Sequence, residues 1–116
     1  VSNSYVTIDK THLTRVLNNL IQNAIQSVYE QKEKKISIKI KSIEEFWSIQ
    51  VKDNGSGIKN EIRSKIFEPN FTTKNSGMGL GLAMVKNIVQ DFGGEISFIT
   101  KLGTGTTFFV KIPKTK

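Results

Sequence analysis

The sequence predicts an α+β fold, a two-layer α/β sandwich in which helices cover one face of a mixed, mostly antiparallel sheet. Two observations carry this prediction. Apolar residues recur with helical spacing in two long stretches, and alternating apolar and polar residues form two pairs of short runs. Paired runs joined by short turns form antiparallel hairpins, which excludes a βαβ architecture. A length of 116 residues fits one domain, so we expect a single domain over 1–116.

The first predicted element is a long amphipathic helix that begins after Asp9, a suitable N-cap residue. A short strand-like run, Tyr5–Ile8, precedes it. The apolar residues of the predicted helix recur at intervals of three and four, which places them on one helix face: Leu13, Val16, Leu17, Leu20, Ile21, Ala24, Ile25 and Val28. The charged stretch 32–35 then reads as a solvated loop.

Two hairpins are predicted downstream. The first pairs 36–41 with 47–52, and its alternation indicates half-buried strands. The second pairs 96–100 with 106–112 through a turn at 102–105.

The segment between the hairpins begins with a turn at 53–57. A short helix within 59–67, ended near Pro69, and a second long helix over 80–92 follow. Gly93 and Gly94 supply the C-cap of that second helix.

Composition excludes several classes of protein. The absence of cysteine excludes a disulfide scaffold and a thiolate zinc site, and a single histidine excludes a multi-histidine metal centre. No apolar run approaches the roughly 20 residues of a membrane span, and the first residues do not form a signal peptide. Seventeen Lys and Arg against ten Asp and Glu give a net charge of +7, which would suit an anionic partner.

Polar residues on the first helix are candidate ligands. At about 100° per residue, Asn19, Asn23 and Gln26 fall on one side, with Asn23 at the border of the apolar face. An amide oxygen there could bind a hard cation such as Mg²⁺. Ordinary surface or capping amides are the alternative.

Asp53 and Thr106 are in phase with the apolar residues of their strands, so both are expected to point inward. A buried carboxylate needs a donor, and an adenine amine would provide one. Gly55 and Gly57 would let a ligand approach the backbone. The alternatives are an Asp that opens a turn and a β-branched residue that fills a strand.

The run Gly77-Met78-Gly79-Leu80-Gly81 precedes the second long helix, where backbone N–H groups can face an anion. Lys74 is a nearby cation. The run is neither a Rossmann fingerprint nor a P-loop, because no strand leads into it and no Gly-Lys-Ser/Thr follows.

Taken in order, these motifs are Asn19-x₃-Asn23, Asp53-x-Gly55-x-Gly57, Ile66-Phe67-Glu68-Pro69 with Phe71, Gly77-x-Gly79-x-Gly81-Leu82, and Gly103-x-Gly105-Thr106. The series resembles the N, G1, F, G2 and G3 boxes of the catalytic and ATP-binding domain of sensor histidine kinases. Their superfamily includes DNA gyrase, the heat-shock chaperone ATPases and the mismatch-repair ATPases. The resemblance covers nearly the whole chain.

The resemblance implies ATP and Mg²⁺ as cofactors. Asn23 matches the Mg²⁺ position and Asp53 the position that binds the adenine amine. Thr106 matches the position that supports Asp53 through water. The implied catalytic residues are Asn19, Asn23 and Lys74. The implied cofactor-binding residues are Asn23, Asp53, Gly55, Gly57, Ile58, Phe67, Phe71, Thr73, Lys74, Gly77, Met78, Gly79, Leu80, Gly81, Leu82 and Thr106.

Departures from the pattern refine the reading. Gyrase-type ATPases carry a Glu as general base where this chain has Asn19, and an amide cannot take a proton from water. This difference favours phosphoryl transfer over hydrolysis. Gln26 and Ser27 replace a cation and a stacking aromatic found in many histidine kinases. Together with Phe71-Thr72-Thr73-Lys74 and a short lid, this resembles the nitrogen-regulation branch.

The resemblance implies a protein histidine kinase whose phosphoacceptor His lies on an upstream dimerisation domain absent from this chain. That His would pass the phosphoryl group to an Asp of a response regulator receiver domain. His12 lacks the acidic neighbour and downstream Pro of a phosphoacceptor motif. We expect a cytoplasmic domain, a homodimeric parent for which an inner-membrane anchor stays open, and no contact of this chain with nucleic acid or membrane. The alternatives are an anti-sigma-type serine kinase and a non-catalytic nucleotide-binding module.

Overall fold

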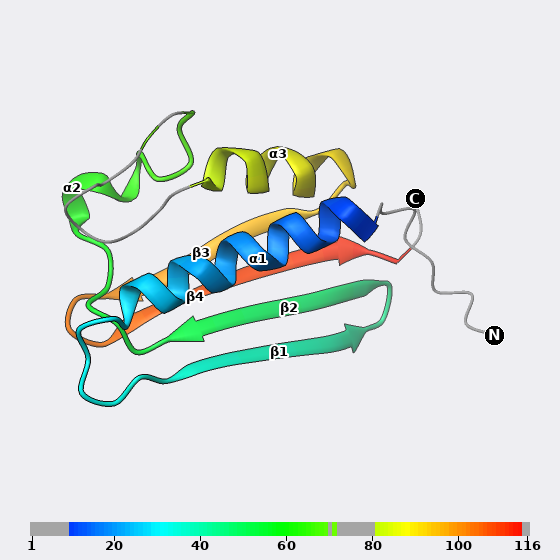
Figure 1. The fold of residues 1–116 in the computed structure, drawn as a ribbon. Helices are drawn as coiled ribbons and strands as arrows, with labels where there is room; N and C mark the ends of the chain where they lie inside the picture. The colour runs from blue at the N-terminus through cyan, green and yellow to red at the C-terminus, as the bar shows by residue number, and fades with distance from the viewer. Residues whose placement is uncertain (1–9, 70, 72–80, 115–116) are drawn as a thin grey trace.

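Four strands and three helices make up the part of the chain that the computed structural model describes, residues 10–69, 71 and 81–114. The strands form one antiparallel sheet in the order β1-β2-β4-β3, and the long helices α1 and α3 cover one of its faces (Figure 1). The element bounds are α1 Lys10–Ser27, β1 Ile36–Ile43, β2 Phe46–Asp53, α2 Asn60–Arg63, α3 Leu82–Asp91, β3 Glu95–Lys101 and β4 Gly105–Pro113.

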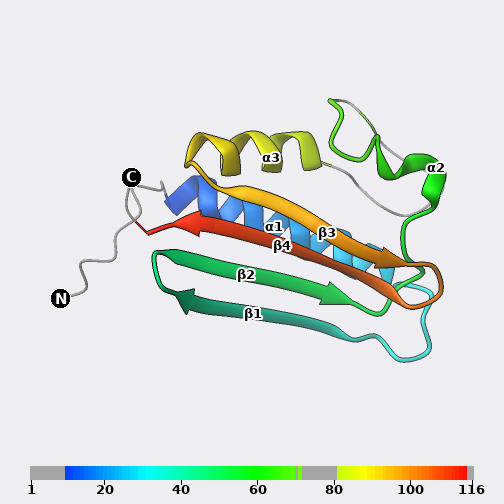
Figure 2. The same cartoon turned by 180° about the vertical axis from the view of Figure 1, so that it is seen from behind.

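This architecture confirms the predicted α+β sandwich with helices on one face. Viewed from behind, β3 and β4 lie in front of α1, and none of the described helices lies on this face of the sheet (Figure 2). All strand pairings in the described residues are antiparallel. The strand-like run at 5–8 lies outside those residues.

The hydrophobic core fills the space between the sheet and the two long helices. α1 packs on β2 and β4, α3 packs on β3 and β4, and the two helices also pack against each other, so their apolar faces meet the inward residues of these three strands. The most deeply buried members, with 0–2% of their surface exposed, include Val16, Leu20, Val51, Val85 and Val110. The helical spacing and the strand alternation of the sequence therefore predicted most of this core.

Some element bounds differ from the prediction. α2 spans only Asn60–Arg63, shorter than the 59–67 stretch proposed for it. α3 ends at Asp91, and its described part begins at Leu82, with Gly81 as N-cap. Residue 80, where we predicted its start, lies outside the described residues.

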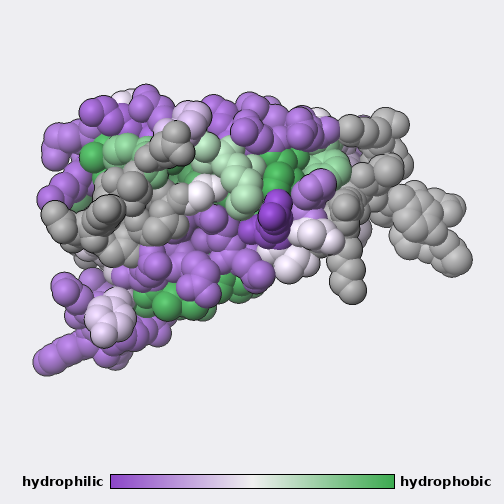
Figure 3. All heavy atoms as spheres, turned by 45° about the horizontal axis from the view of Figure 1, so that its top comes forward, coloured by the Kyte–Doolittle hydropathy of each residue, from purple (hydrophilic) through white to green (hydrophobic). Residues whose placement is uncertain are grey.

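The prediction that β1 is half-buried was wrong. Ile36, Ile38 and Ile40 are 36%, 46% and 59% exposed, although they pair with inward-facing residues of β2. The reason is the position of α1, which packs on β2 and β4, whereas the described packing of β1 is against β2. A hydrophobic strip follows the lower edge of the surface in Figure 3, where Figure 1 places β1. Ile25, predicted on the apolar face of α1, is also 44% exposed.

Strand register brings the polar candidates together at one end of the sheet. Asp53, the last residue of β2, pairs with Thr106 near the start of β4, and Thr106 also pairs with Thr100 near the end of β3. The C-terminal end of α1 reaches the same place, because Ser27 contacts Asp53.

Candidate functional site

Asp53 lies at the centre of this polar cluster. Its side chain points to the helix-covered side of the sheet, and only 5% of its surface is exposed. The Oδ1 atom accepts hydrogen bonds from the Gly55 N–H (2.8 Å), the Thr106 N–H (3.3 Å) and the Ser27 hydroxyl (3.2 Å). All three bonds end on the same oxygen, so among the described residues the second oxygen, Oδ2, has no such donor. The protein thus fixes the orientation of the carboxylate and leaves one acceptor for another molecule.

The environment of Asp53 disfavours its charged form. Burial raises the pKa of this carboxyl above the ordinary value of 3.8, although the hydrogen bonds from Gly55, Thr106 and Ser27 act in the opposite direction. A buried carboxylate without a full set of donors is costly, and an N–H donor from a ligand reduces that cost. The site therefore suits a ligand that presents a hydrogen-bond donor to Oδ2.

The two predicted glycines of the turn after β2 are required by close packing. A side chain at Gly55 would overlap Ser27 on α1. Gly57 has φ = 83°, in the left-handed region, and its Cα lies against the backbone of Lys101 and Leu102. The turn is therefore pressed between α1 and the β3–β4 hairpin, which fixes its position beside Asp53.

A pair of threonines ties the β3–β4 hairpin to that turn. Thr106 is 3% exposed, and its hydroxyl lies 2.8 Å from the Thr100 hydroxyl. The Thr100 oxygen also accepts a hydrogen bond from the Ile58 N–H at 2.9 Å. Thr106 therefore supports Asp53 directly through its backbone N–H and holds the surrounding backbone through its side chain.

Asn23 provides a second buried polar group, on α1. It is 1% exposed, and its Nδ2 donates to Asn19 Oδ1 at 3.2 Å. Its Oδ1 is buried and has no hydrogen-bond partner among the described residues. Gly81, at the start of α3, packs so closely on the Asn19 side chain that any larger residue there would overlap it. The N-terminal end of α3 thus meets Asn19, which is itself hydrogen-bonded to Asn23.

The orphaned Asn23 oxygen fits a hard cation. Mg²⁺ prefers oxygen ligands and keeps waters or ligand phosphates in its coordination shell. No group of three or more His, Cys, Asp or Glu residues that could hold a metal occurs in the described residues. A cation at Asn23 would therefore complete its shell from a bound ligand and water.

Four other predicted residues lie in or against the hydrophobic core. Ile58 and Leu82 are each 1% exposed, and Phe67 and Phe71 pack against the same cluster. The Phe67 ring also lies 6.0 Å from that of Phe98, centroid to centroid. The side chains of these four residues therefore belong to the hydrophobic core or its border, and their predicted contact with a nucleotide stays a prediction. The remaining predicted residues, Thr73, Lys74, Gly77, Met78, Gly79 and Leu80, lie outside the described residues.

Two contributors were missed from the sequence. Ser27 was noted only for what it lacks, a ring or a charge, yet its hydroxyl binds Asp53. Its spacing of four residues from Asn23 placed it on the same helix face and was a usable signal. Thr100 was not considered, although it alternates in phase with inward-facing Phe98 and lies opposite Thr106 in the register.

Comparison with known proteins is consistent with this geometry. The model of the family described as "Histidine kinase-, DNA gyrase B-, and HSP90-like ATPase" matches residues 8–116. The chain belongs to this family. Membership makes it a histidine-kinase-type ATPase domain with a general ATP-binding catalytic role.

Similar curated proteins are bacterial sensor kinases. The sensor histidine kinase ZraS of Escherichia coli is 42% identical over 105 residues, which cover 90% of this chain and 22% of ZraS. The C4-dicarboxylate transport sensor protein DctB of Rhizobium meliloti is 37% identical over 106 residues, 91% of this chain and 17% of DctB. The chain thus spans about a fifth of these relatives.

Solved structures agree with the fold. The nucleotide-free catalytic domain of histidine kinase ThkA has a TM-score of 0.80 at 38% identity, covering 93% of this chain and 70% of that one. The predicted resemblance to sensor histidine kinases is therefore confirmed. The nitrogen-regulation branch has only loose support: an NtrY-like sensor of Rickettsia bellii is 34% identical, but ZraS and DctB are more similar. None of the helices in the described part of the chain has the length and apolar character needed to cross a membrane.

Proposed function

We propose that residues 1–116 form one catalytic and ATP-binding domain of a two-component sensor histidine kinase. In this proposal the domain holds ATP–Mg²⁺ and transfers the γ-phosphoryl group to a His on a dimerisation domain of the parent protein. That His then passes the phosphoryl group to an Asp on a response regulator receiver domain. The family match and the sensor kinases among the relatives support this assignment.

The observation that carries the proposal is the buried Asp53 carboxylate with one oriented and one available oxygen. The three donors on Oδ1 hold the group in place. Oδ2 then accepts a hydrogen bond from the exocyclic amine of adenine, and Gly57 lies against the base. Thr106 keeps Asp53 in register through its backbone N–H.

At the phosphate end, Asn23 Oδ1 would ligate Mg²⁺, which supplies positive charge to the β- and γ-phosphate oxygens when bound. Lys74 and the glycines from 77 to 81 would bind the phosphates, and Gly81 already packs against Asn19. Asn19 does not take a proton from water, so the bound γ-phosphate is preserved for transfer. Catalysis then rests on positioning and charge stabilisation.

The partners follow from the same proposal. In this proposal the parent dimerises through helices upstream of this domain. Its partner, a receiver domain, takes the phosphoryl group. The catalytic domain works in the cytoplasm. A segment of the parent that carries the His is therefore the substrate.

Isothermal titration with ATP and Mg²⁺ tests nucleotide binding. Asp53→Asn keeps an oxygen that can accept the three hydrogen bonds. Its N–H₂ group then faces the adenine amine, so two donors meet and the negative charge is gone. We therefore expect the affinity for ATP to fall about 100-fold, or about 3 kcal/mol. Asp91→Asn, which removes a carboxylate from the end of α3, is the matched control. No ATP binding, or equal affinity in Asp53→Asn and wild type, would contradict the proposal.

Phosphoryl transfer needs a separate assay. The chain is incubated with [γ-³²P]ATP, Mg²⁺ and the parent's upstream helical segment, with and without its His replaced by Gln. Acid-labile label on the segment that depends on the His supports a histidine kinase. Acid-stable label on a serine would instead indicate an anti-sigma-type kinase, and nucleotide binding without any transfer would indicate a non-catalytic module.

A further inference from the structure

The face of the sheet opposite α1 and α3 carries ordered rows of polar residues. In one row Ser37, Lys52 and Thr107 lie side by side on β1, β2 and β4, and in the next row Lys39, Gln50 and Phe109 do so. Their neighbours along β2, Val51 and Asp53, point to the helices, so these rows point away from them.

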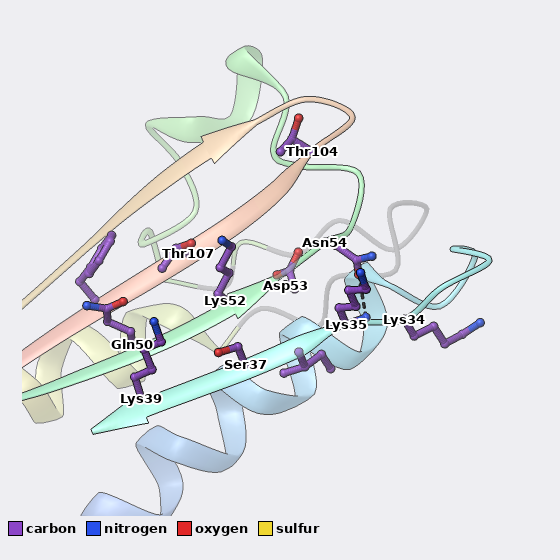
Figure 4. A pocket seen from close by; sticks show the side chains of 12 residues that line it. Lys34, Lys35, Ser37, Lys39, Gln50, Lys52, Asp53, Asn54, Thr104 and Thr107 are labelled. Carbon is purple, nitrogen blue, oxygen red and sulfur yellow. Dashed lines mark hydrogen bonds between the residues drawn. The ribbon is translucent and has the colours of Figure 1, made fainter. Parts of the chain in front are cut away.

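A cavity of about 720 Å³ lies over these two rows. Its floor consists of Gln50, Thr107 and Phe109, and its rim includes Lys39 and Lys52 from the strands and Lys34 and Lys35 from the loop before β1 (Figure 4). Figure 4 shows Lys39, Gln50, Lys52 and Thr107 projecting from neighbouring strands toward one space. The Lys34 ammonium donates to the Gln31 carbonyl and Lys35 pairs with Glu33, so the cavity combines the ammonium groups of Lys39 and Lys52 with uncharged hydrogen-bonding groups below them.

The charge on this face is strongly one-sided. On its strands the described lysines are Lys39, Lys41, Lys52, Lys101 and Lys111, whereas the only strand carboxylate on the same face is Glu95. Among the described residues, the one ion pair joins Lys35 to Glu33, so Lys39 and Lys52 have no acidic partner. They are diagonal neighbours on adjacent strands, and such like charges repel unless an anion lies between them.

Asp53 is the one carboxylate in the cavity lining, but it does not neutralise the lysines. It is 5% exposed, and its Oδ1 is hydrogen-bonded to Ser27 on α1. The carboxylate therefore faces the nucleotide side of the sheet, and the lysine-rimmed cavity faces the other side. A ligand in the cavity would not occupy the proposed ATP site.

We propose that this cavity is a docking site for an acidic segment of a partner protein, with carboxylate side chains between Lys39 and Lys52. Charge complementarity carries the proposal: an exposed, unneutralised lysine cluster attracts carboxylates. Gln50 and Thr107 supply hydrogen bonds to the segment's polar groups, and Phe109 supplies a small apolar contact. The proposal goes beyond nucleotide binding and does not depend on it.

Other polyanions fit less well. Single-stranded nucleic acid is bound by successive aromatic rings on which bases stack, and this cavity has one, Phe109. Its cations are all lysines, without the arginines that bind phosphate in a bidentate manner. An acidic protein segment needs neither feature.

Fluorescence anisotropy with a labelled oligoglutamate peptide tests the proposal, using the full 116-residue chain. We expect binding that weakens with salt and falls about tenfold in Lys39→Gln/Lys52→Gln. Lys59→Gln/Lys65→Gln changes net charge equally at exposed positions near α2 and should bind as wild type does. The single change Gln50→Glu places a negative charge on the cavity floor and should also weaken binding.

Amide chemical shifts locate the peptide independently. Peptide-induced shifts centred on Gln50, Thr107 and Phe109 support the proposal, and ATP affinity should be the same in both lysine variants. The proposal is overturned by no peptide binding, by equal losses in the two lysine variants, or by shifts elsewhere. It is also overturned if single-stranded DNA of equal charge or phosphatidylserine vesicles bind the cavity more tightly than the peptide.

Discussion

Asp53 and Asn23 are both almost fully buried, with 5% and 1% of their surface exposed, yet the protein treats them differently. Asp53 receives hydrogen bonds from three groups on one oxygen, whereas the Asn23 oxygen has no partner among the described residues. The Asp53 end is therefore pre-organised by the fold. The Asn23 end is incomplete, and in the proposed function a cation and its phosphate ligands would complete it. Under the proposed function, the base-recognition end would thus be built before the nucleotide arrives, and the phosphate end would be assembled with it.

The largest effect on stability is expected from Gly55→Ala, which tests how Asp53 is held. The new methyl group would overlap Ser27 on α1, and we expect a loss of about 2 kcal/mol in the free energy of unfolding, measured by urea denaturation. Gly103→Ala is the control. Nothing lies near a Cβ there, so only its φ of 78° opposes the change, at about 1 kcal/mol. Equal losses would show that α1 does not press on the turn.

Asn23→Ala tests the incomplete end. The variant loses the orphaned oxygen, so we expect affinity for ATP in the presence of Mg²⁺ to fall about tenfold, or about 1.4 kcal/mol. Affinity for ATP in EDTA should stay the same, because the proposed contact between Asp53 and the base is intact. Gln22→Ala, an exposed neighbour on α1, is the control. An equal loss with and without Mg²⁺ would mean that Asn23 has only a structural role.

The smallest effect concerns the pH dependence of stability without nucleotide. Burial raises the pKa of Asp53, so the native state holds its proton more tightly than the unfolded state does. The contribution of Asp53 to stability is therefore full below pH 3.8 and is lost as pH rises through the folded-state pKa. Asp53→Asn removes this titration. The free energy of unfolding of the variant minus that of wild type should therefore increase as pH rises from 3.8 through the folded-state pKa. A difference that is constant with pH would contradict the burial effect.

The sequence was sufficient for the parts of this molecule that depend on local spacing. The three-and-four spacing gave the buried face of α1, and strand phase placed Asp53 and Thr106 inward. It failed where burial depends on which strand a helix covers. Ile36, Ile38 and Ile40 alternate like core residues, but α1 lies over β2 and β4 and leaves them exposed.

The hydrogen-bond partners within the site were also only partly predictable. Gly55 and Gly57 suggested access for a ligand, and the structure shows that both also pack against neighbouring backbone or side chains. Thr100 becomes a candidate only once the register places it opposite Thr106. Cross-strand and helix–turn contacts require a tertiary arrangement that spacing alone does not specify.

The central claim is that Asp53 recognises the amine of adenine, and comparing ATP with inosine triphosphate tests it most directly. Inosine carries a carbonyl oxygen where adenine carries its exocyclic amine. We expect wild-type protein to prefer ATP by about 30-fold, or about 2 kcal/mol, and Asp53→Asn to bind the two nucleotides within about threefold of each other. A preference for ATP that is unchanged in Asp53→Asn would contradict the account.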